Sequence, residues 1–297
     1  MAAASLLGLL QSLLGQGVIA FAFAIFWTAF IEAVRIPIGD RVRKSEWWPR
    51  AVPPQINIMV NFGYSKDKTT EDHALYGFVW IITMCITHIV SASLMVPVMV
   101  YGWSEAGDVG QVLFFLGTLS EVGFDVYDWS KTFLLTFAHS SVSNLGPPGP
   151  VKAFVLICIL HHSTVLGLTF PMNLKYPSMT AYHWVAFSLL VSAGVCYIAG
   201  QYKFTLDAKT KSGLATIKLI MTIQFVFNWL SRVGIWFPAV FIALRTMYGK
   251  GDMLYFTGGL IGGLGMSLYN LLVVADATMA LLKWLPRTVD SCATKES

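Results

Sequence analysis

The amino-acid sequence predicts an all-α membrane protein with seven transmembrane helices. Of the 297 residues, 56% are hydrophobic and only 12% are charged, whereas about a quarter of the residues in a soluble domain are charged. The mean hydropathy is +0.64. Apolar runs of about twenty residues, long enough to cross a bilayer core, recur along the chain. These three observations leave no stretch for a sizeable soluble domain.

The apolar runs define seven spans in chain order. We place them at residues 13–35, 74–101, 111–138, 151–171, 181–203, 214–246 and 254–285. The third and sixth runs are the least uniform, because both contain charged residues. Turn-rich segments, 140–150 and 171–178, follow the third and fourth spans. The N-terminus lacks the basic segment of a cleaved signal peptide, so we expect the first span to be retained.

The polar stretch 36–73 is expected to be a membrane-surface loop, with Trp47 and Trp48 at the level of the lipid headgroups. The predicted organisation is therefore an N-terminal span with a basic loop (1–73), a main membrane domain (74–285) and a short tail (286–297). In the last span, the overlapping pairs Gly258/Gly262 and Gly259/Gly263 predict close approach of another helix.

Basic residues predict the orientation of the chain. They concentrate in the first loop, the fifth loop and the tail: Arg35, Arg41, Arg43, Lys44, Arg50, Lys66, Lys68; Lys203, Lys209, Lys211; Lys283, Arg287 and Lys295. With seven spans these segments share one side. The positive-inside rule then places the N-terminus outside or in the lumen and the C-terminus in the cytosol. Because the basic residues lie in loops, the net charge of +4 does not indicate a nucleic-acid partner.

Polar and ionisable side chains interrupt four of the spans. Such groups are costly in a bilayer and normally face a bundle interior or a wet cavity. Glu121, Asp125 and Asp128 follow i, i+4, i+7 spacing and so lie on one helical face, where Lys131 is expected to neutralise part of their charge. We expect this stripe to converge on one polar cavity with the remaining clusters: His88; His161 and His162; and Gln224, Asn228 and Arg232.

The adjacent pair His161 and His162 holds the candidate catalytic residues. Consecutive helical positions point about 100° apart, so one imidazole is expected to contact a neighbouring helix while the other faces the cavity. A structural role remains open for other groups: Arg232 as one half of an ion pair, and Glu121 and Asp128 as solvated groups near an interface.

Several classes of membrane protein do not fit. A retinal protein needs a lysine in the middle of its last span, and Lys283 lies at its end. The sequence signatures of a G-protein-coupled receptor are missing from the third and seventh spans. A di-iron desaturase needs more histidines than the six present. A bis-histidine haem between His88 and one of the paired histidines remains open.

In order along residues 80–285, five segments resemble motifs of the TLC-domain family, which includes the ceramide synthases. They are ITHIVSAS, VGFDVYD, LHHSTVLGL, FVFNWLSRVGIWFP and LGMSLYNLL. The resemblance implies six or more helices in a ring around a lipid-accessible cavity, usually in the endoplasmic reticulum. It also suggests candidate substrate-binding residues: His88, Glu121, Asp125, Asp128, Asn228, Arg232 and Asn270.

In the ceramide synthases the histidine pair is linked with acyl transfer from acyl-CoA to a sphingoid base. The resemblance thus implies that His161 or His162 is a general base or an acyl carrier. Those enzymes carry acids in the span after the pair, but here no acid lies between Tyr182 and Tyr202. Asp125 or Asp128 would have to orient the imidazole instead.

The leading hypothesis is a TLC-type protein that binds membrane lipids or fatty-acyl chains in an intramembrane cavity and acts in sphingolipid or phospholipid homeostasis. One alternative is an acyl-CoA-dependent sphingoid-base N-acyltransferase, with fatty acyl-CoA as co-substrate and no metal or resident cofactor. Another is an accessory lipid-holding subunit of a larger membrane complex. Whether the protein acts as a homo-oligomer stays open.

Overall fold

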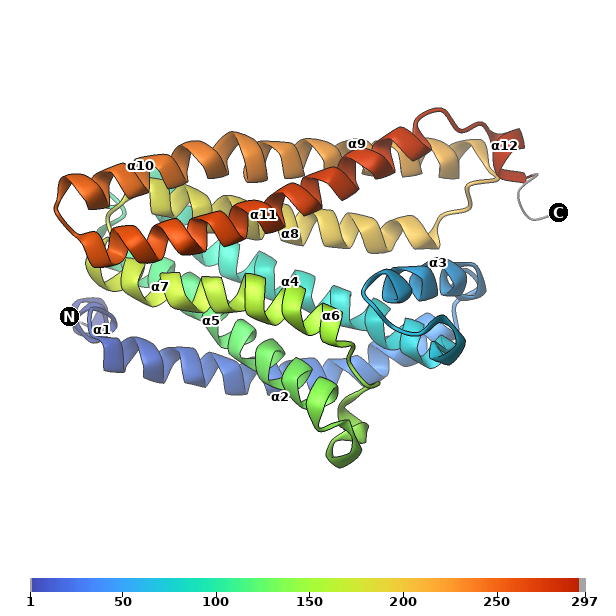
Figure 1. Cartoon of the computed structure of the whole chain (residues 1–297), viewed down its shortest axis with the longest axis horizontal. Helices are drawn as coiled ribbons and strands as arrows, with labels where there is room; N and C mark the ends of the chain where they lie inside the picture. Colours follow the sequence, from blue (N-terminus) through green and yellow to red (C-terminus); the bar gives the residue numbers. More distant parts are fainter. Residues whose placement is uncertain (1, 294–297) are drawn as a thin grey trace.

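The computed structural model describes residues 2–293 of the chain (Figure 1). Residues 1 and 294–297, which include Lys295 of the predicted tail, lie outside the described residues. Residues 2–293 form helices, turns and irregular segments without a β-strand, and seven of the helices are long and apolar enough to cross a membrane. The predicted all-α membrane class and the seven spans are confirmed.

The long helices coincide with the predicted spans. The first three are α2 (Leu13–Arg43), α4 (Glu71–Tyr101) and α5 (Gly107–Phe137). The remaining spans are α6–η4–α7 (Val151–Ala153, Phe154–His162, Ser163–Lys175), α8 (Thr180–Thr205), α9–η5–α10 (Lys211–Trp229, Leu230–Ile235, Trp236–Gly249) and α11 (Met253–Trp284). Shorter elements are α1 (Ala2–Leu10), α3 (Trp48–Asn61), α12 (Val289–Ala293) and the 3₁₀ turns η1 (Lys66–Lys68), η2 (His139–Ser141) and η3 (Ser143–Leu145).

The predicted loop 36–73 is largely helical, which corrects the sequence interpretation. Helix α2 continues to Arg43, and α3 occupies Trp48–Asn61 despite containing Pro53 and Pro54. The buried side chains of α3 recur every three or four residues, so one face packs on the protein: Trp48, Ala51, Gln55 and Met59. This spacing of the buried side chains is typical of a helix, although the two prolines argue against one.

Trp48 is a packing residue of α3, a contact that the sequence did not predict, and its place at the level of the lipid headgroups stays a prediction. Its side chain is only 1% exposed. Its indole Nε1 donates a hydrogen bond of 2.8 Å to Glu71 Oε1 at the start of α4. The neighbouring Trp47 is half-buried and packs on Phe78. Both tryptophans, at the start of α3, therefore contact α4.

Helix packing follows a cyclic order around the core. Helix α4 contacts α5 and α8; α8 contacts α9 and α10; α11 contacts α9, α10 and α7; and α7 contacts α5. Helix α2 packs outside this group against α5 and α4. The most apolar window of α5 is 72% buried, compared with 22% for α2, so the acidic stripe of α5 lies inside the protein.

Glycines permit the closest helix contacts. A Cβ added at Gly117 would lie 2.6 Å from the carbonyl oxygen of Ser91 in α4, and one at Gly123 would lie 2.7 Å from that of Ala20 in α2. In α11, Gly259, Gly262 and Gly263 face side chains of α10 or α7, as predicted, because a Cβ at each would meet an atom at 3.0–3.2 Å. Gly258 faces open space.

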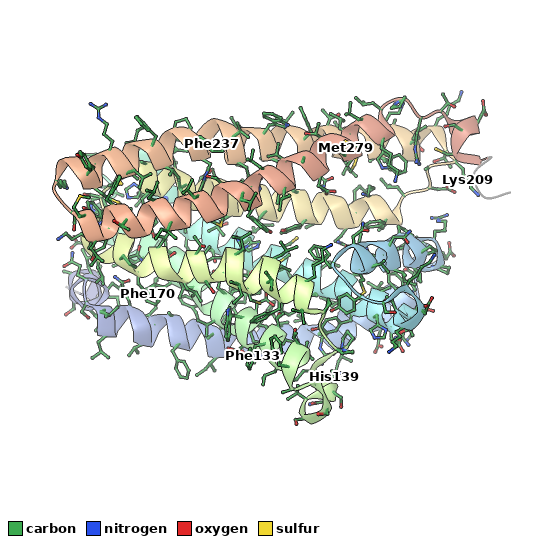
Figure 2. All side chains as sticks on the ribbon, in the orientation of Figure 1. Phe133, His139, Phe170, Lys209, Phe237 and Met279 are labelled. Atoms are coloured by element: carbon green, nitrogen blue, oxygen red, sulfur yellow. The ribbon has the colours of Figure 1, made fainter. Side chains whose placement is uncertain are left out.

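The outer surface is rich in apolar side chains. Figure 2 marks Phe237 of α10 and Met279 of α11 among them, and these are 40% and 65% exposed. Leu14 and Leu254 are exposed to 79% and 81%. In water such a surface would drive aggregation, whereas against lipid tails it is the stable arrangement.

Candidate functional site

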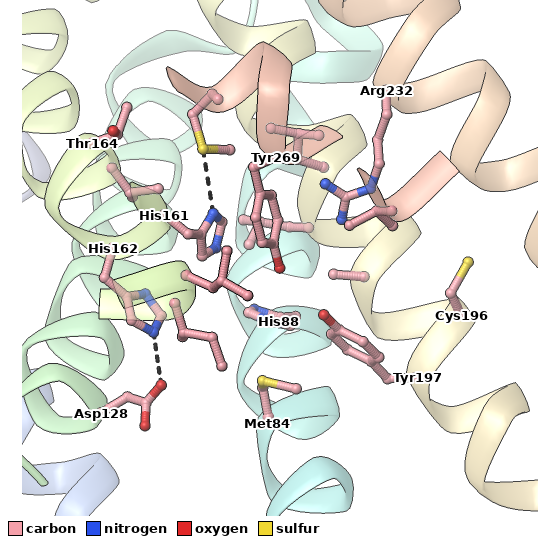
Figure 3. A pocket seen from close by; sticks show the side chains of 18 of the residues that line it. Met84, His88, Asp128, His161, His162, Thr164, Cys196, Tyr197, Arg232 and Tyr269 are labelled. Carbon is pink, nitrogen blue, oxygen red and sulfur yellow. Dashed lines mark hydrogen bonds and ion pairs between the residues drawn. The ribbon is translucent and has the colours of Figure 1, made fainter. Parts of the chain in front are cut away.

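A cavity of about 730 Å³ lies among the helices, within the size range of small-molecule sites. Its lining comes from α3, α4, α5, η4, α7, α8, α9, η5, α10 and α11. Most of the lining side chains are apolar. Figure 3 shows the polar part, where His88, His161, His162, Tyr197, Tyr269 and Arg232 lie around one space.

These polar residues occupy one level of the molecule, because each lies near the middle of its own helix. His88 is central in α4, His162 lies near the centre of the fourth span, and Arg232 is close to the centre of α9–η5–α10. Three of these residues lie in two π-helical segments: His161 and His162 end η4, and Arg232 lies in η5. Such segments are rare in proteins as a whole, but those that occur are often found at functional sites.

His162 is held between two acids of α5. Its Nδ1 lies 2.7 Å from Asp125 Oδ1, and its Nε2 lies 2.7 Å from Asp128 Oδ2. The Nε2 contact has hydrogen-bond geometry, whereas the Nδ1 contact has the short distance only. A neutral imidazole has a single N–H, so carboxylates at both ring nitrogens favour the doubly protonated, cationic ring. All three side chains are buried.

A second buried pair joins α4 to α5. His88 Nδ1 lies 2.8 Å from Glu121 Oε1. The imidazole of His88 is stacked at 6.3 Å on the ring of Tyr197 in α8 and meets Phe124 edge-on. The pair lines the cavity next to Tyr197.

His161 has no acid among its contacts in the described residues. Its Nδ1 lies 3.3 Å from Met266 Sδ, and its ring stacks at 4.7 Å on Tyr269 of α11. A thioether sulfur can only accept, so Nδ1 carries the proton of a neutral ring. The Nε2 lone pair then remains available on the cavity side (Figure 3). The two imidazoles contact different helices, α5 for His162 and α11 for His161, and both line the cavity.

Arg232 is anchored by two asparagines. Its Nε donates to Asn228 Oδ1 at 3.0 Å, and its Nη1 donates to Asn270 Oδ1 at 2.6 Å. The guanidinium carbon lies 5.9 Å from the centre of the Tyr269 ring. No acid within residues 2–293 lies at ion-pair distance from it. The interpretation of Arg232 as one half of an ion pair is therefore wrong.

The structure brings most of the predicted site residues together. The cavity is lined by His88, Glu121, Asp128, His161, His162, Asn228 and Arg232. Asp125 and Asn270 do not line it; they lie behind His162 and Arg232 and hold them in place. The fifth span has no acid that could orient an imidazole. Asp125 and Asp128 of the third span contact the imidazole of His162 instead.

Lys131 forms its ion pair with an acid of α2, while its charge also attracts Asp128 of the acidic stripe. Its Nζ lies 2.6 Å from Glu32 Oε1 of α2 and 3.0 Å from the hydroxyl of Tyr127. Glu32 was missed because it lies close to the charged end of the first span. Tyr197 and Tyr269 were also missed, since a tyrosine in an apolar run gives no signal that distinguishes a cavity from a dry contact.

Tyr64, in the connection between α3 and α4, is among the residues that line the cavity. Burial, together with the negative charge of Asp128, raises the pKa of the Tyr64 hydroxyl to about 12. The hydroxyl therefore stays neutral at physiological pH.

Both ring nitrogens of His162 lie at carboxylates, so His162 has no free nitrogen for a haem iron. A haem between His88 and His161 stays a prediction. Among residues 2–293, no group of three or more His, Cys, Asp and Glu side chains has the arrangement to hold a metal ion.

No family model, curated protein or solved structure matches the chain.

Proposed function

We propose that the protein is a TLC-type membrane protein of the endoplasmic reticulum that binds lipid or fatty-acyl chains in its intramembrane cavity and acts in sphingolipid or phospholipid homeostasis. The observation that carries the proposal is the cavity of about 730 Å³ with an apolar lining and one polar level near mid-helix. The cyclic order of helix contacts supports the ring expected for this family. Because the cavity lies among membrane-spanning helices, lipids that diffuse in the bilayer are the apolar compounds nearest to it.

Blocking the cavity tests the proposal. Ala243 of α10 lines the cavity, and its neighbour Ile242 is 52% exposed on the outer surface. We expect the purified wild-type protein and the matched control Ile242→Phe to retain co-purifying lipid and to bind a fluorescent fatty acid. In Ala243→Phe, both the lipid and the binding should be lost. Equal binding in all three proteins would place the ligand elsewhere and refute the proposal.

A second candidate function is acyl transfer from acyl-CoA to a sphingoid base. The observation that favours it is the His161 ring at the cavity wall, where Met266 Sδ accepts a hydrogen bond from Nδ1–H and Nε2 is left for a ligand. This nitrogen can take the proton of an attacking amine. Since no carboxylate contacts His161 among the described residues, its imidazolium would lack the stabilisation that acids give His162.

Turnover with labelled acyl-CoA and a sphingoid base separates the two functions. For a transferase we expect product from the wild-type protein and none from His161→Ala, while lipid remains bound to the variant. Bound lipid without product in either protein would support the binding function alone.

A further inference from the structure

Arg232 differs from the other buried charges at the polar level. His88 faces Glu121, His162 faces Asp125 and Asp128, and Lys131 faces Glu32. Arg232 is 4% exposed, yet its contacts in residues 2–293 are the neutral amides of Asn228 and Asn270 and the ring of Tyr269. Its second terminal nitrogen, Nη2, has no hydrogen-bond partner among the described residues. The guanidinium borders the cavity.

This arrangement leaves a positive charge without a counter-charge. A guanidinium stays protonated in proteins, and a buried charge is stable only when it is paired. The face of Tyr269 attracts the cation but carries no net charge. The surplus carboxylate of the His162 cluster lies on the other wall, beyond ion-pair distance (Figure 3).

The two halves of the cavity differ in polarity. Toward α3 the lining includes Gln55, Lys131, Gln201, Lys203 and Asp276. Toward the opposite end, where α7 joins α8 and α10 joins α11, the lining residues carry no charge. Examples are Met95, Leu168, Met172, Leu190, Leu244 and Met247. Arg232 lies between the two halves.

We propose that Arg232 binds the carboxylate of a long-chain fatty acid, whose aliphatic chain occupies the apolar half of the cavity toward Met247. This inference rests on the proposed lipid-binding function and adds the head group and the direction of the chain. The unpaired Nη2 donates to the carboxylate, and the hydroxyls of Tyr197 and Tyr269, which point into the same space (Figure 3), supply further hydrogen bonds.

Charge and length both favour this ligand. A carboxylate carries one negative charge, which matches the single guanidinium, whereas a phosphate monoester carries about −1.5 to −2 at neutral pH. From Arg232 to Met247 the helix rises roughly 20 Å, which suits a long aliphatic chain.

The test compares head groups on the same chain. Binding of labelled oleate, oleyl alcohol and butyrate is measured to the purified protein in a neutral detergent. We expect oleate to bind about tenfold or more tightly than the alcohol, because hydrogen bonds to charged groups are the stronger ones. Butyrate, a carboxylate without a long chain, should not bind measurably. Arg232→Gln should reduce oleate affinity to that of the alcohol, and Arg232→Lys should retain part of the preference.

The outcomes separate this inference from the proposed function. Equal affinities for oleate and oleyl alcohol in the wild-type protein would overturn the carboxylate assignment and leave lipid binding intact, and this comparison needs no variant to fold. Binding of neither chain would overturn both proposals. For the direction of the chain, Ala243→Phe should weaken oleate binding, while Ala280→Phe, in the other half of the cavity lining, should not. The reverse result would contradict the assigned direction.

Discussion

At the scale of single residues, the adjacent imidazoles of His161 and His162 have different surroundings. His162 is enclosed by Asp125 and Asp128, so it belongs to a buried charge network of α5. His161 contacts the neutral side chains of Met266 and Tyr269 and the ring of His162, has no acid among its described contacts, and lines the cavity. The first histidine of the pair is therefore available to a ligand, and the second holds the fourth span against α5.

Alanine substitutions should separate these roles. His162→Ala removes the imidazole that lies against Asp125 and Asp128 and leaves two buried carboxylates close together, at an expected cost of about 3–5 kcal/mol in stability. His161→Ala removes mainly a ring contact, at a cost of about 1 kcal/mol. Thermal unfolding in detergent, followed by tryptophan fluorescence, should show a much lower midpoint for His162→Ala. Equal midpoints for the two variants would contradict the assignment.

The contact between Lys131 and Glu32 should be measurable as a coupling energy. The Lys131 side chain is 4% exposed and that of Glu32 is 27% exposed. We expect Lys131→Met and Glu32→Gln to destabilise the protein individually, and the double variant to lose less than the sum, with a coupling of about 0.5–3 kcal/mol. Arg43→Ala, which breaks an exposed pair with Asp72, should cost no more than about 1 kcal/mol. Additive effects would mean that the Lys131 contact is energetically unimportant.

At the scale of helices, the sequence predicted the spans well because each is a long apolar run whose length the bilayer fixes. It failed for α3, which is amphipathic and contains Pro53 and Pro54. It also failed for η4 and η5, since a π-helical segment changes the hydrogen-bond step without changing hydropathy. Both failures concern local backbone geometry, which tertiary contacts decide.

The close contact between α5 and α2 should depend on Gly123. A side chain there meets the backbone of Ala20, which cannot move aside. We expect Gly123→Leu to cost at least about 1–3 kcal/mol, the usual range for overpacking, and to lower the yield of folded protein. Gly258→Leu in α11 is the matched control, because nothing lies within 4 Å of its added Cβ. Equal folded yields, measured by size-exclusion chromatography, would show that α2 adjusts.

At the scale of the whole molecule, convergence of polar residues on one cavity could be predicted, because each residue is too costly to face lipid. The individual pairings could not. Whether Asp125 or Glu121 meets His162 depends on the rotation and depth of α5 relative to η4, and hydropathy contains no information on either. For the same reason, the sequence could not predict that Arg232 lies away from every acid among the described residues. The proposal of a carboxylate ligand depends on this separation.

The orientation of the chain in the membrane is a prediction that one native thiol can test. Cys85, Cys158 and Cys196 are buried, whereas Cys292 of α12 is half-buried near the basic residue Arg287. If basic loops face the cytosol, a membrane-impermeant maleimide added to sealed microsomes should label Cys292 without detergent. The control is Ser104→Cys, placed in the exposed connection between α4 and α5, in a Cys292→Ser background.

This control should be labelled only after the microsomes are opened, because its connection lies on the side opposite α12. If Ser104→Cys were labelled in sealed microsomes while Cys292 of the wild-type protein were not, the orientation would be the reverse of the predicted one. The polar half of the cavity beside α3, with Lys131 and Lys203, would then open toward the lumen. A cytosolic acyl-CoA could not enter the site from that end, so the acyltransferase candidate would lose its supply of co-substrate, whereas binding of a fatty acid from the bilayer would be unaffected.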